Sequence, residues 1–508
     1  MNPIDFFWRA VQRHADRPAV ITPAGSLSFA VLGRKVQALA AALQHIDPVA
    51  GNRVGLGAIN SDDHLVSLLA ILASGKTWVP LNPRSGTPDL RRIVDFTEPS
   101  ILMLDGPMLQ RLGDMSPRVI GIGDAGGEGG EAMAQQLHRY RDAAFLHVDR
   151  PLSEVQAIKF TGGTTGVPKG VMQGCRAWNT MIASQLHAFG FNETDRFLVS
   201  APLTHGSSTY VLPILGAGGC LMFPAETRAG AILDAIEQQG VTTLFVPPVM
   251  VHMLVQEQAA HPRNTASLRN IIYGAAPMSE QRIREAQQCF GTVLATTYGQ
   301  TEAPQIISWL GARELADARN VASVGRAGLL TRVCIAGPDG HPIDTAGVEG
   351  EVLVRGDLVM NGYWRNPEKT AETLIDGWLH TGDVGLLDER GFLFLKGRSD
   401  DVIISGGFNV HPSDVEAVLV RFPGVSECCV VGLADEKWGE VVTAAITLKP
   451  GQTVAIPELI AFAKAELGSV LAPKAIHVLQ SLPRTAVDKV PRKLVREAIQ
   501  VLLAGQGG

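Results

Sequence analysis

The chain has 508 residues, of which 46% are hydrophobic and 19% charged, and its formal net charge is −6. That length exceeds what one hydrophobic core usually holds, so we expect at least two domains. The slight acidity argues against broad nucleic-acid binding, and no long uncharged apolar run predicts a segment that spans a membrane. The first residues lack a basic stretch followed by an apolar one, so no secretory signal is evident. We therefore expect a cytoplasmic protein.

Six cysteines are scattered along the chain without the paired spacing of a metal site. Cys428 and Cys429 are adjacent within a strand-like stretch, which indicates core positions and not a redox centre. This usage fits a reducing compartment.

The first 150 residues alternate predicted strands with predicted helices. Strands are expected at 53–58 and 77–81, and helices at 36–43 and 63–72. Such alternation predicts α/β layers built on parallel strands.

A loop rich in glycine and threonine, residues 160–170, lies between a predicted strand at 155–160 and a predicted helix at 176–189. Glycines let backbone N–H groups approach an anion, threonine hydroxyls add donors, and Lys169 adds a positive charge. A simple surface turn has a similar composition. A Walker loop is excluded, because Lys169 is followed by glycine where that loop has serine or threonine. The loop chemistry favours a polyphosphate ligand.

Further predicted strands, at 196–200, 243–246, 270–273 and 293–296, each end in a turn of small, polar or acidic residues. These turns include His205, the segment 274–277 and the segment 298–302. Open α/β sheets place their ligands at the C-terminal ends of strands, so the pattern predicts one nucleotide site here. Alone, a histidine is more often structural, and an acid such as Glu302 is more often a solvated surface residue.

Beyond about residue 321 the pattern changes to short strands separated by glycine turns, at 332–336, 350–355 and 391–396. This spacing predicts a small antiparallel or barrel-like unit. A polar break at 397–401 marks the expected end of the large domain, and a small α+β domain should follow it. The predicted division is 1–398, a hinge at 399–400, and 401–508, and no internal repeat is present.

With these residues in view, the chain resembles the adenylate-forming (AMP-binding) superfamily, and within it the acyl-CoA synthetase or fatty-acid–CoA ligase type. Seven motifs occur in the family's order: the 160–170 loop, the His205 region, the 274–277 turn, the 298–302 segment, Gly382-Asp383, Gly397-Arg398 and Lys489. The resemblance implies an α/β fold in which a large N-terminal domain of stacked α/β subdomains carries a small barrel-like unit. A small α+β C-terminal domain would be hinged to it.

The resemblance also implies residue roles. Lys489, His205 and Glu302 would be catalytic, with Lys489 bridging the carboxylate and the α-phosphate. Glu302 and Thr165 would hold Mg²⁺, a hard ion that prefers oxygen ligands. ATP or AMP would be bound by Thr161, Gly162, Gly163, Thr164, Thr165, Gly166, Lys169, Gly274, Ala275, Ala276, Tyr298, Gly299, Gln300, Thr301, Asp383 and Arg398.

The same resemblance implies a domain rotation about Asp400, after which CoA would enter a channel lined by Gly406 and Gly407. The acyl pocket would include Gly206, Ser207, Tyr210 and Pro304. Its segments, 205–210, 272–274 and 299–306, contain small and apolar residues and no Lys or Arg. We therefore expect a fatty or aromatic monocarboxylic acid, long-chain fatty acids included, without grounds to choose between the two classes.

Three positions depart from the family pattern. Gly162 replaces the usual serine, which removes one hydroxyl donor, and Asp488 replaces the glycine before the catalytic lysine. Ile404 and Gly406 stand where luciferases and coumarate-type ligases often carry lysines, which argues against a luciferase-like oxidation.

The function expected from this resemblance is an ATP-dependent acid–CoA ligase that works through an acyl-AMP intermediate and releases AMP and pyrophosphate. One alternative is a stand-alone acyl-AMP ligase that loads a carrier protein in trans, and another is a non-catalytic nucleotide-binding protein. The joint presence of Lys489, Glu302, Asp383 and Lys169 argues against the non-catalytic alternative. The partners are then a carboxylic acid, ATP and CoA, and a homodimer is compatible with a sequence that does not fix the oligomeric state.

Overall fold

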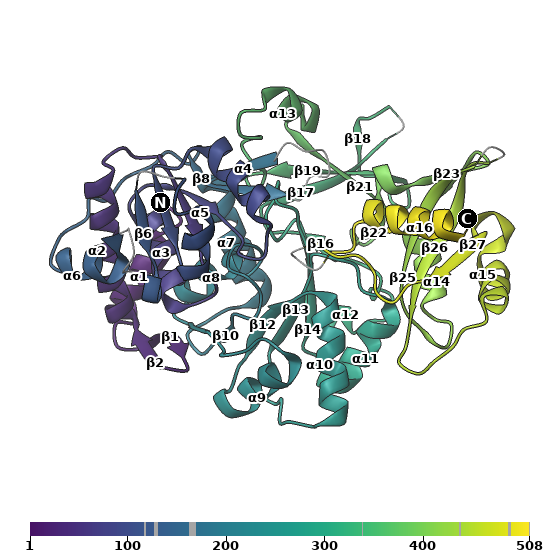
Figure 1. Ribbon diagram of the computed structural model, residues 1–508, viewed down its shortest axis with the longest axis horizontal. Coiled ribbons are helices and arrows are strands. Elements are labelled where there is room, and N and C mark those ends of the chain that lie inside the picture. The colour runs from purple at the N-terminus through teal and green to yellow at the C-terminus, as the bar shows by residue number, and fades with distance from the viewer. Residues whose placement is uncertain are drawn as a thin grey trace. The chain divides into compact units, whose positions relative to one another are not determined.

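The computed structural model describes residues 1–115, 118–125, 131–161, 169–337, 339–435, 438–485 and 489–506. The chain forms two compact units, the first made of Met1–Val333 and Val354–Leu379, the second of Cys334–Leu353 and His380–Gly508. Figure 1 labels their elements. Each unit is described by itself below.

One of the two large sheets of the first unit has seven strands in the order β7-β6-β5-β3-β4-β8-β9. All of its pairs are parallel except β8 with β9. The bounds are β3 Arg53–Gly57, β4 Thr77–Pro80, β5 Ile101–Leu104, β6 Val119–Gly121, β7 Glu131–Ala132, β8 Val155–Thr161 and β9 Lys169–Gly174. Strands β3, β4 and β5 are buried almost throughout, as expected for parallel strands covered on both faces.

The other large sheet has nine strands in the order β16-β15-β14-β13-β12-β10-β11-β1-β2. Its central strands β14, β13, β12, β10 and β11 run parallel, so their C-terminal ends share one edge. The bounds are β1 Pro18–Thr22, β2 Gly25–Ser28, β10 Arg196–Leu198, β11 Cys220–Met222, β12 Thr243–Val246, β13 Asn270–Tyr273, β14 Leu294–Tyr298, β15 Ser308–Leu310 and β16 Arg326–Ala327.

Helices connect and cover these strands, and several begin or end where local sequence dictates. The Ser61 side chain caps α3 by accepting from the His64 N–H, and Gly190 ends α7 in the left-handed conformation. Helix α2 packs on α3 and α6, and α7 packs on α8. The helices of this unit are α1 Asp5–Arg13, α2 Phe29–Ile46, α3 Asp62–Ala73, α4 Thr87–Thr97, α5 Gly106–Leu112, α6 Met133–Arg139, α7 Cys175–Phe189, α8 Ser208–Gly216, α9 Ala229–Gln239, α10 Pro248–Ala260, α11 Glu280–Phe290, α12 Ala312–Leu315 and α13 Pro367–Thr373.

A third sheet of six strands has the order β18-β17-β19-β21-β20, with β22 beside β21. Its bounds are β17 Thr331–Ala336, β18 Pro342–Ile343, β19 Glu349–Gly356, β20 Leu374–Ile375, β21 Trp378–Leu387 and β22 Leu393–Arg398. The 3₁₀ turn Ser399–Asp401 follows β22 and contains the expected hinge residue Asp400. The hinge itself stays a prediction.

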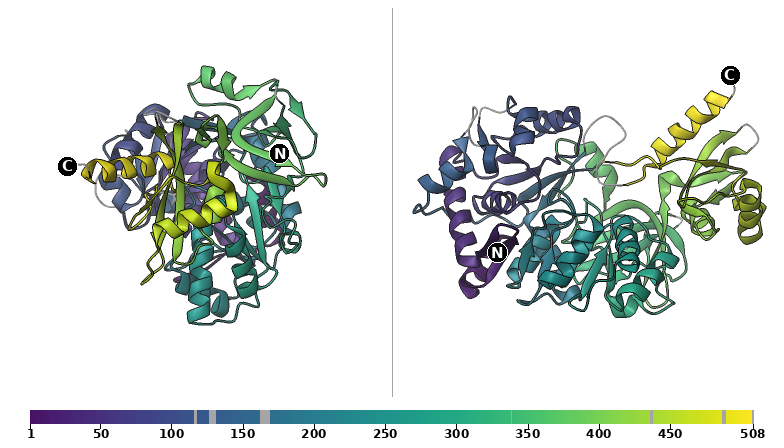
Figure 2. Two further views of the ribbon diagram at one scale, coloured as in Figure 1. Left: turned by 90° about the vertical axis from the view of Figure 1, so that its right-hand side faces the viewer. Right: turned by 60° about the horizontal axis from the view of Figure 1, so that its bottom comes forward.

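The second unit also contains a five-stranded sheet, β24-β23-β26-β25 with β27 beside β26. Helices α14 and α16 pack on β25, and α16 continues to an exposed end at Val501–Leu503 (Figure 2). The bounds are β23 Ile403–Ser405, β24 Phe408–Val410, β25 Val425–Asp435, β26 Gly439–Leu448, β27 Ala475–Val478, α14 Pro412–Leu419, α15 Ile456–Leu471 and α16 Arg492–Gln506. All the strands expected from the sequence are present.

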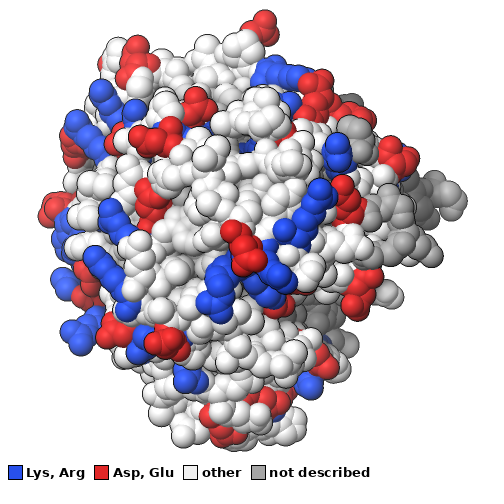
Figure 3. All heavy atoms as spheres, turned by 90° about the vertical axis from the view of Figure 1, so that its left-hand side faces the viewer, with Lys and Arg blue, Asp and Glu red and all other residues white. Residues whose placement is uncertain are grey.

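Three global expectations can be compared with this structure. None of the six cysteines forms a disulfide, and Cys429 is buried in the core of the second unit. Within the described residues, no helix has the length and apolar character needed to cross a bilayer. On the face shown in Figure 3, basic and acidic side chains alternate without an extended patch of one sign.

Candidate active site

Three of the predicted site loops leave neighbouring parallel strands at the same edge of the nine-stranded sheet. The loop with His205 follows β10, the turn at Gly274 follows β13, and Gly299 follows β14. Strand β12 lies between β10 and β13. The structure thus brings together segments that are nearly a hundred residues apart in the chain.

Close packing against β12, which carries Phe245, and against β14, which carries Thr297, explains why two of these loops carry glycine. A Cβ on Gly206 would lie 2.5 Å from the Phe245 ring, and a Cβ on Gly274 would lie 2.9 Å from the Thr297 carbonyl oxygen. Both positions therefore exclude larger residues. The ring of Tyr210 stacks between Phe197 and Phe245, with centroids 5.2 Å apart on each side.

Gln305 joins helix α8 to strand β14. Its amide nitrogen donates to the Tyr210 hydroxyl at 2.9 Å and to Thr297 Oγ1 at 3.0 Å, while its amide oxygen accepts from Thr209 Oγ1 at 3.2 Å. Gln305 has a positive φ of 65°, and its backbone comes so close to Gly299 that a Cβ there would lie 2.6 Å away. Burial raises the pKa of Tyr210, so this hydroxyl stays neutral.

Glu302 is held by the segment that precedes α13. The Tyr363 hydroxyl donates to Glu302 Oε1 at 2.9 Å, and the Met360 N–H donates to the Glu302 carbonyl at 2.8 Å. The same segment bonds to β9, where the Trp364 N–H donates to the Gly170 carbonyl at 2.7 Å. One short stretch of chain therefore fixes Glu302 and the strand that begins at Lys169.

A second chain of contacts reaches the neighbouring residue, Thr301. The Gln173 amide nitrogen donates to the Thr301 carbonyl at 2.8 Å, and the Trp178 indole N–H donates to the Gln173 amide oxygen at 3.1 Å. Strand β9 and helix α7 thereby position the Thr301–Glu302 turn from behind.

The turn expected to flank adenine has two different surfaces. Ala275 and Ala276 are exposed, and Ala275 has a positive φ of 68°. Tyr298, at the end of β14, is only 9% exposed. The small exposed side chains and the buried ring fit a flat ligand, and their role stays a prediction.

Most of the predicted phosphate loop lies outside the described residues, including Gly162, Gly163, Thr164, Thr165 and Gly166. Its two ends are described. Thr161 ends β8 and pairs with Lys169, the first residue of β9, so the loop is the connection of an antiparallel hairpin.

The predicted ribose pair lies in the second unit, on adjacent strands. Asp383 and Arg398 face each other across β21 and β22, and Arg398 Nη1 donates to Asp383 Oδ1 at 3.0 Å. Gly382 has a positive φ of 69°, and its N–H donates to Glu351 Oε1 at 2.7 Å. The two side chains therefore contact each other, and their role in binding remains a proposal.

Lys489 also lies in the second unit, in an exposed loop before α16. The Thr485 N–H donates to the Lys489 carbonyl at 2.8 Å, and the Lys489 N–H donates to Thr485 Oγ1 at 3.2 Å. Asp488 lies outside the described residues. The backbone of Lys489 is thus held by a closed turn.

Gly406 and Gly407 form the two-residue turn between β23 and β24. Both have positive φ, 59° and 85°, as type I′ hairpin turns require. A Cβ on Gly406 would lie 2.7 Å from the Trp438 ring, whose backbone carbonyl accepts from the Gly406 N–H at 2.8 Å. Local packing therefore requires glycine at 406, whether or not a thiol arm passes there.

The acidic residues present fit a magnesium ion held jointly by protein and substrate. In the described part of the chain no three His, Cys, Asp or Glu side chains cluster as a complete metal cage. Mg²⁺ commonly uses one or two carboxylates and completes its shell with substrate phosphates and water. Glu302 offers such a carboxylate, because Tyr363 occupies only Oε1 and Oε2 has no hydrogen-bond partner among the described residues.

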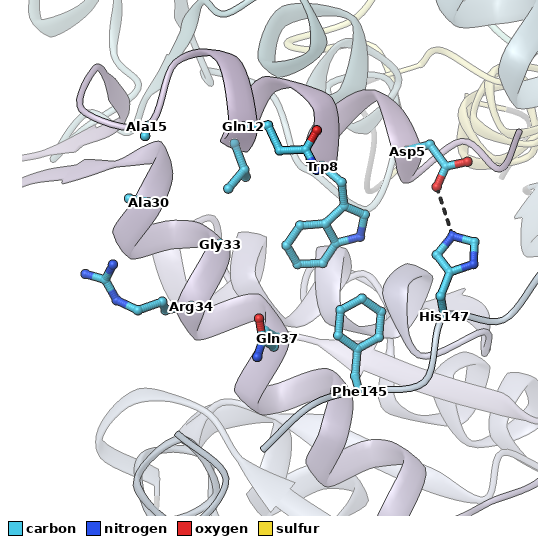
Figure 4. Close-up of a pocket in the computed structure, with 11 residues that line it drawn as sticks. Asp5, Trp8, Gln12, Ala15, Ala30, Gly33, Arg34, Gln37, Phe145 and His147 are labelled. Carbon is cyan, nitrogen blue, oxygen red and sulfur yellow. Dashed lines mark hydrogen bonds and ion pairs between the residues drawn. The ribbon is translucent and has the colours of Figure 1, made fainter. Parts of the chain in front are cut away.

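A separate cavity of about 650 Å³ lies between α1, α2 and the segment 145–147 (Figure 4). Trp8 stacks on Phe145 with ring centroids 5.2 Å apart, and Asp5 pairs with His147 at 3.2 Å. None of the predicted site residues is among the residues that line it.

Three residues that shape this site were not singled out from the sequence, although Gln305 lies within the segment 299–306 that was expected to line the acyl pocket. Tyr363 and Gln305 act through contacts across 61 and 95 residues of chain, which no local pattern reports. Lys159, a buried lysine in β8, had a visible signal, since it interrupts the apolar run before the phosphate loop.

Comparison with known proteins decides the family. Residues 7–364 match the family described as AMP-binding enzyme, and residues 414–489 match the AMP-binding enzyme C-terminal domain. The chain belongs to the AMP-binding enzyme family. The resemblance inferred from the motifs is confirmed.

Individual relatives cover nearly the whole chain. A medium/long-chain-fatty-acid–CoA ligase, FadD8 of Mycobacterium tuberculosis, is 33% identical over 96% of this chain and 88% of its own length. An indoleacetate–CoA ligase of Aromatoleum aromaticum is also 33% identical, over 96% of this chain and 97% of its own. The solved amide bond synthetase McbA of Marinactinospora thermotolerans superimposes with a TM-score of 0.90, at 28% identity over 98% of this chain and 99% of that one. The expected fold class is confirmed.

Proposed function

We propose that this AMP-binding enzyme activates a fatty or aromatic monocarboxylic acid with ATP and transfers the acyl group to CoA. The observation that carries the proposal is the convergence of the His205, Gly274 and Gly299 loops on one sheet edge, beside a carboxylate that Tyr363 holds in place. Family membership over almost the full chain supports an acid–thiol ligase of the AMP-forming kind.

In the first step, a carboxylate oxygen of the acid attacks the α-phosphorus of ATP. An acyl–phosphate bond forms, the bond to the bridging oxygen breaks, and pyrophosphate leaves. Both reactants are anionic, so the site must neutralise charge while it aligns them. Lys489 is the proposed cation between the carboxylate and the α-phosphate, and Lys169 and Thr161 are proposed to bind the outer phosphates.

Glu302 would hold Mg²⁺, which would supply charge neutralisation at the phosphates. Asp383 would accept hydrogen bonds from the ribose hydroxyls, with Arg398 orienting it through their 3.0 Å contact. Ala275, Ala276 and Tyr298 would border the adenine.

In the second step, the thiolate of CoA attacks the acyl carbonyl carbon of the acyl-AMP. A thioester forms, the acyl–phosphate bond breaks, and AMP leaves. The proposal retains a hinge at Asp400 and a thiol channel at Gly406 and Gly407. A long-chain substrate, the need for Mg²⁺, a cytoplasmic location and a homodimer are further parts of this proposal.

The relatives support a fatty acid and an aromatic acid equally. One relative named above is a fatty-acid ligase and the other acts on an arylacetic acid, at the same identity. In the structure, the segment after His205 is small or buried, and Pro304 and Ile306 are buried.

The test measures pyrophosphate and AMP release from Mg·ATP over matched fatty and aromatic acids, with and without CoA. Turnover that depends on CoA for one acid class supports the proposal and names the class. Pyrophosphate exchange without CoA-dependent turnover overturns the thioester step and favours loading of a carrier protein in trans. Absence of activity with every acid overturns the proposal.

A variant tests the role of the lysine directly. Lys489→Ala should lower the rate of acyl-AMP formation by about 10²–10³-fold, the usual loss for one group that stabilises a developing charge. Binding of ATP, followed by calorimetry, should be largely retained. Lys493→Ala is the matched control, because it removes a positive charge four residues away. A Lys489→Ala enzyme with full activity would contradict the mechanism.

A further inference from the structure

Strand β8 of the seven-stranded sheet carries a buried lysine. Lys159 is 7% exposed, and its Nζ lies 2.9 Å from Ser208 Oγ. The same nitrogen lies 4.9 Å from the ring centroid of Trp78 and 5.7 Å from that of Trp178. We call Lys159, Trp78, Trp178, Ser207 and Ser208 the Lys159 cluster.

The hydrogen bonds of this cluster leave donors without acceptors. Ser208 gives its own proton to the His205 carbonyl at 2.6 Å, so its oxygen can only accept from Lys159. An ammonium has three donors, and among the described residues Ser208 is its only hydrogen-bond partner, with no carboxylate paired to it.

Two neighbouring groups show the same shortage. The Trp78 indole N–H and the Ser207 hydroxyl are both buried, and neither has a hydrogen-bond partner in the described part of the chain. The Trp178 indole N–H differs, because Gln173 accepts it. The cluster is therefore rich in donors and poor in acceptors.

Such an arrangement is costly unless something compensates it. A buried polar group without a partner costs on the order of 1–3 kcal/mol, and a buried unpaired charge costs more. The two tryptophan rings offer only part of the compensation, because cation–π contacts contribute about 0.5–2 kcal/mol. Burial lowers the pKa of Lys159 to about 7, which shows how poorly the cluster supports the charge by itself. An incoming hydrogen-bond acceptor, above all an anionic one, would stabilise the charged form of Lys159.

The position of the cluster says where that acceptor comes from. Ser207 and Ser208 directly follow His205 and Gly206, in the loop that we propose to line the acyl group. Lys159 lies two residues before Thr161, at the end of the strand that leads into the phosphate loop. The cluster thus borders the proposed acid site and not a remote surface.

We propose that the Lys159 cluster recognises an acceptor oxygen on the acid substrate, a second carboxylate or a carbonyl at the end remote from the reacting carboxylate. Lys159 is then a specificity-determining residue, and the preferred acid carries an oxygen-bearing group where a plain fatty acid has only hydrocarbon. This inference rests on the proposed ligase function. A remote carbonyl would narrow the monocarboxylic class of that proposal, whereas a second carboxylate would replace it with a dicarboxylic acid.

The test compares three acids of equal chain length: an unsubstituted acid, an acid with a remote ketone, and a dicarboxylic acid. The wild-type enzyme and Lys159→Met are assayed for pyrophosphate release with Mg·ATP. We expect the wild type to favour one oxygen-bearing acid by 10-fold or more in kcat/KM, and Lys159→Met to lose or reverse that preference. The ketone and the dicarboxylic acid tell a neutral acceptor from an anionic one.

A second variant is included in case Lys159→Met does not fold. A second measurement tests binding of the acid separately from the reaction rate. Trp78→Phe keeps an aromatic ring beside Lys159 and removes the unpartnered N–H, so it should weaken the preference by a few-fold. In the absence of ATP, the preferred acid should raise the melting temperature of the wild type and not that of Lys159→Met.

An identical order of preference in wild type and Lys159→Met would overturn the inference, as would a wild type that favours the unsubstituted acid. Either result, with turnover intact, leaves the ligase function standing. Loss of turnover with every acid would overturn the proposed function, and this inference with it.

Discussion

Two buried lysines, one just before β4 and one in the neighbouring strand β8, differ in their partners. Lys76, just before β4, is 1% exposed, and its Nζ donates to the carbonyls of Asp47 and Val49 at 2.5 Å each. Asp47 Oδ2 lies 3.2 Å from the same nitrogen. Lys159, in β8, is almost as buried and has one serine hydroxyl and two aromatic rings. Strands β4 and β8 pair directly.

The carboxylate beside Lys76 is itself well supported. Burial alone would raise the pKa of Asp47, but hydrogen bonds from Ser100 and Asn52, from the Val49 N–H and from Lys76 bring that pKa below its ordinary value. Lys76 is therefore one member of a complete polar network. The comparison teaches that burial of a charged side chain does not distinguish structure from function, whereas the number of its partners does.

The largest expected effect comes from breaking the complete network. Lys76→Met leaves Asp47 as a buried charge without its cation and two carbonyls without a donor. The free energy of unfolding should therefore fall by about 3–5 kcal/mol. Urea denaturation at pH 7 measures this loss.

Lys35→Met is the control for that experiment. Lys35 lies 3.9 Å from Asp62 and from Asp63 with its side chain 30% exposed, so its loss should change stability by no more than about 1 kcal/mol. A Lys76→Met protein as stable as the control would mean that partner number does not mark a structural lysine.

Removing Lys159 should change the stability in the opposite direction and make the protein more stable. Lys159→Met takes away a charge that the folded state supports poorly, and we expect a gain of about 1–3 kcal/mol at pH 6 after discounting the lost contacts with Ser208 and the rings.

The pH dependence of folding stability follows from the lowered pKa of Lys159. The folded pKa of Lys159, about 7, lies below its ordinary value of 10.5, so the unfolded chain binds more protons between these two values. The stability of the wild type should therefore rise with pH through this window, and the advantage of Lys159→Met should be largest below pH 7 and shrink toward pH 10. Urea denaturation at pH 6 and pH 9 checks this, and a variant less stable than wild type at pH 6 would contradict it.

The same residues show how much of the structure can be predicted from the sequence. Seven strands of the two large sheets were predicted, namely β3, β4, β8, β10, β12, β13 and β14, and so was the order of the site loops, because buried strands and glycine turns leave local patterns. The remaining strands of these sheets were not predicted. Lys159 was counted within an apolar strand, since its lack of partners depends on Trp78, Trp178 and Ser208, which come from three other elements. The ligand channel at Gly406 stays a prediction, and the positive φ and the nearby Trp438 ring favour glycine there in any case.

Glu302 lies between these two extremes, because one of its carboxylate oxygens has a partner and the other has none among the described residues. Tyr363→Phe removes that partner and keeps the ring. A hydrogen bond to a charged group contributes about 1.5–3 kcal/mol, so the dissociation constant for Mg·ATP should rise by about 10–100-fold. Calorimetry with Mg·ATP measures it without relying on turnover, and KM for the acid should change much less.

Tyr140→Phe provides the matched control, since Tyr140 follows α6 and lies outside the proposed site. If Tyr363→Phe bound Mg·ATP like the control, Glu302 would need no positioning and its second oxygen would carry no special meaning. If binding weakened as expected, a half-satisfied carboxylate beside a phosphate site would behave as the Lys159 cluster is proposed to behave. At Glu302 and at the Lys159 cluster alike, the missing partner would then arrive with a substrate, Mg·ATP at the first and the acid at the second.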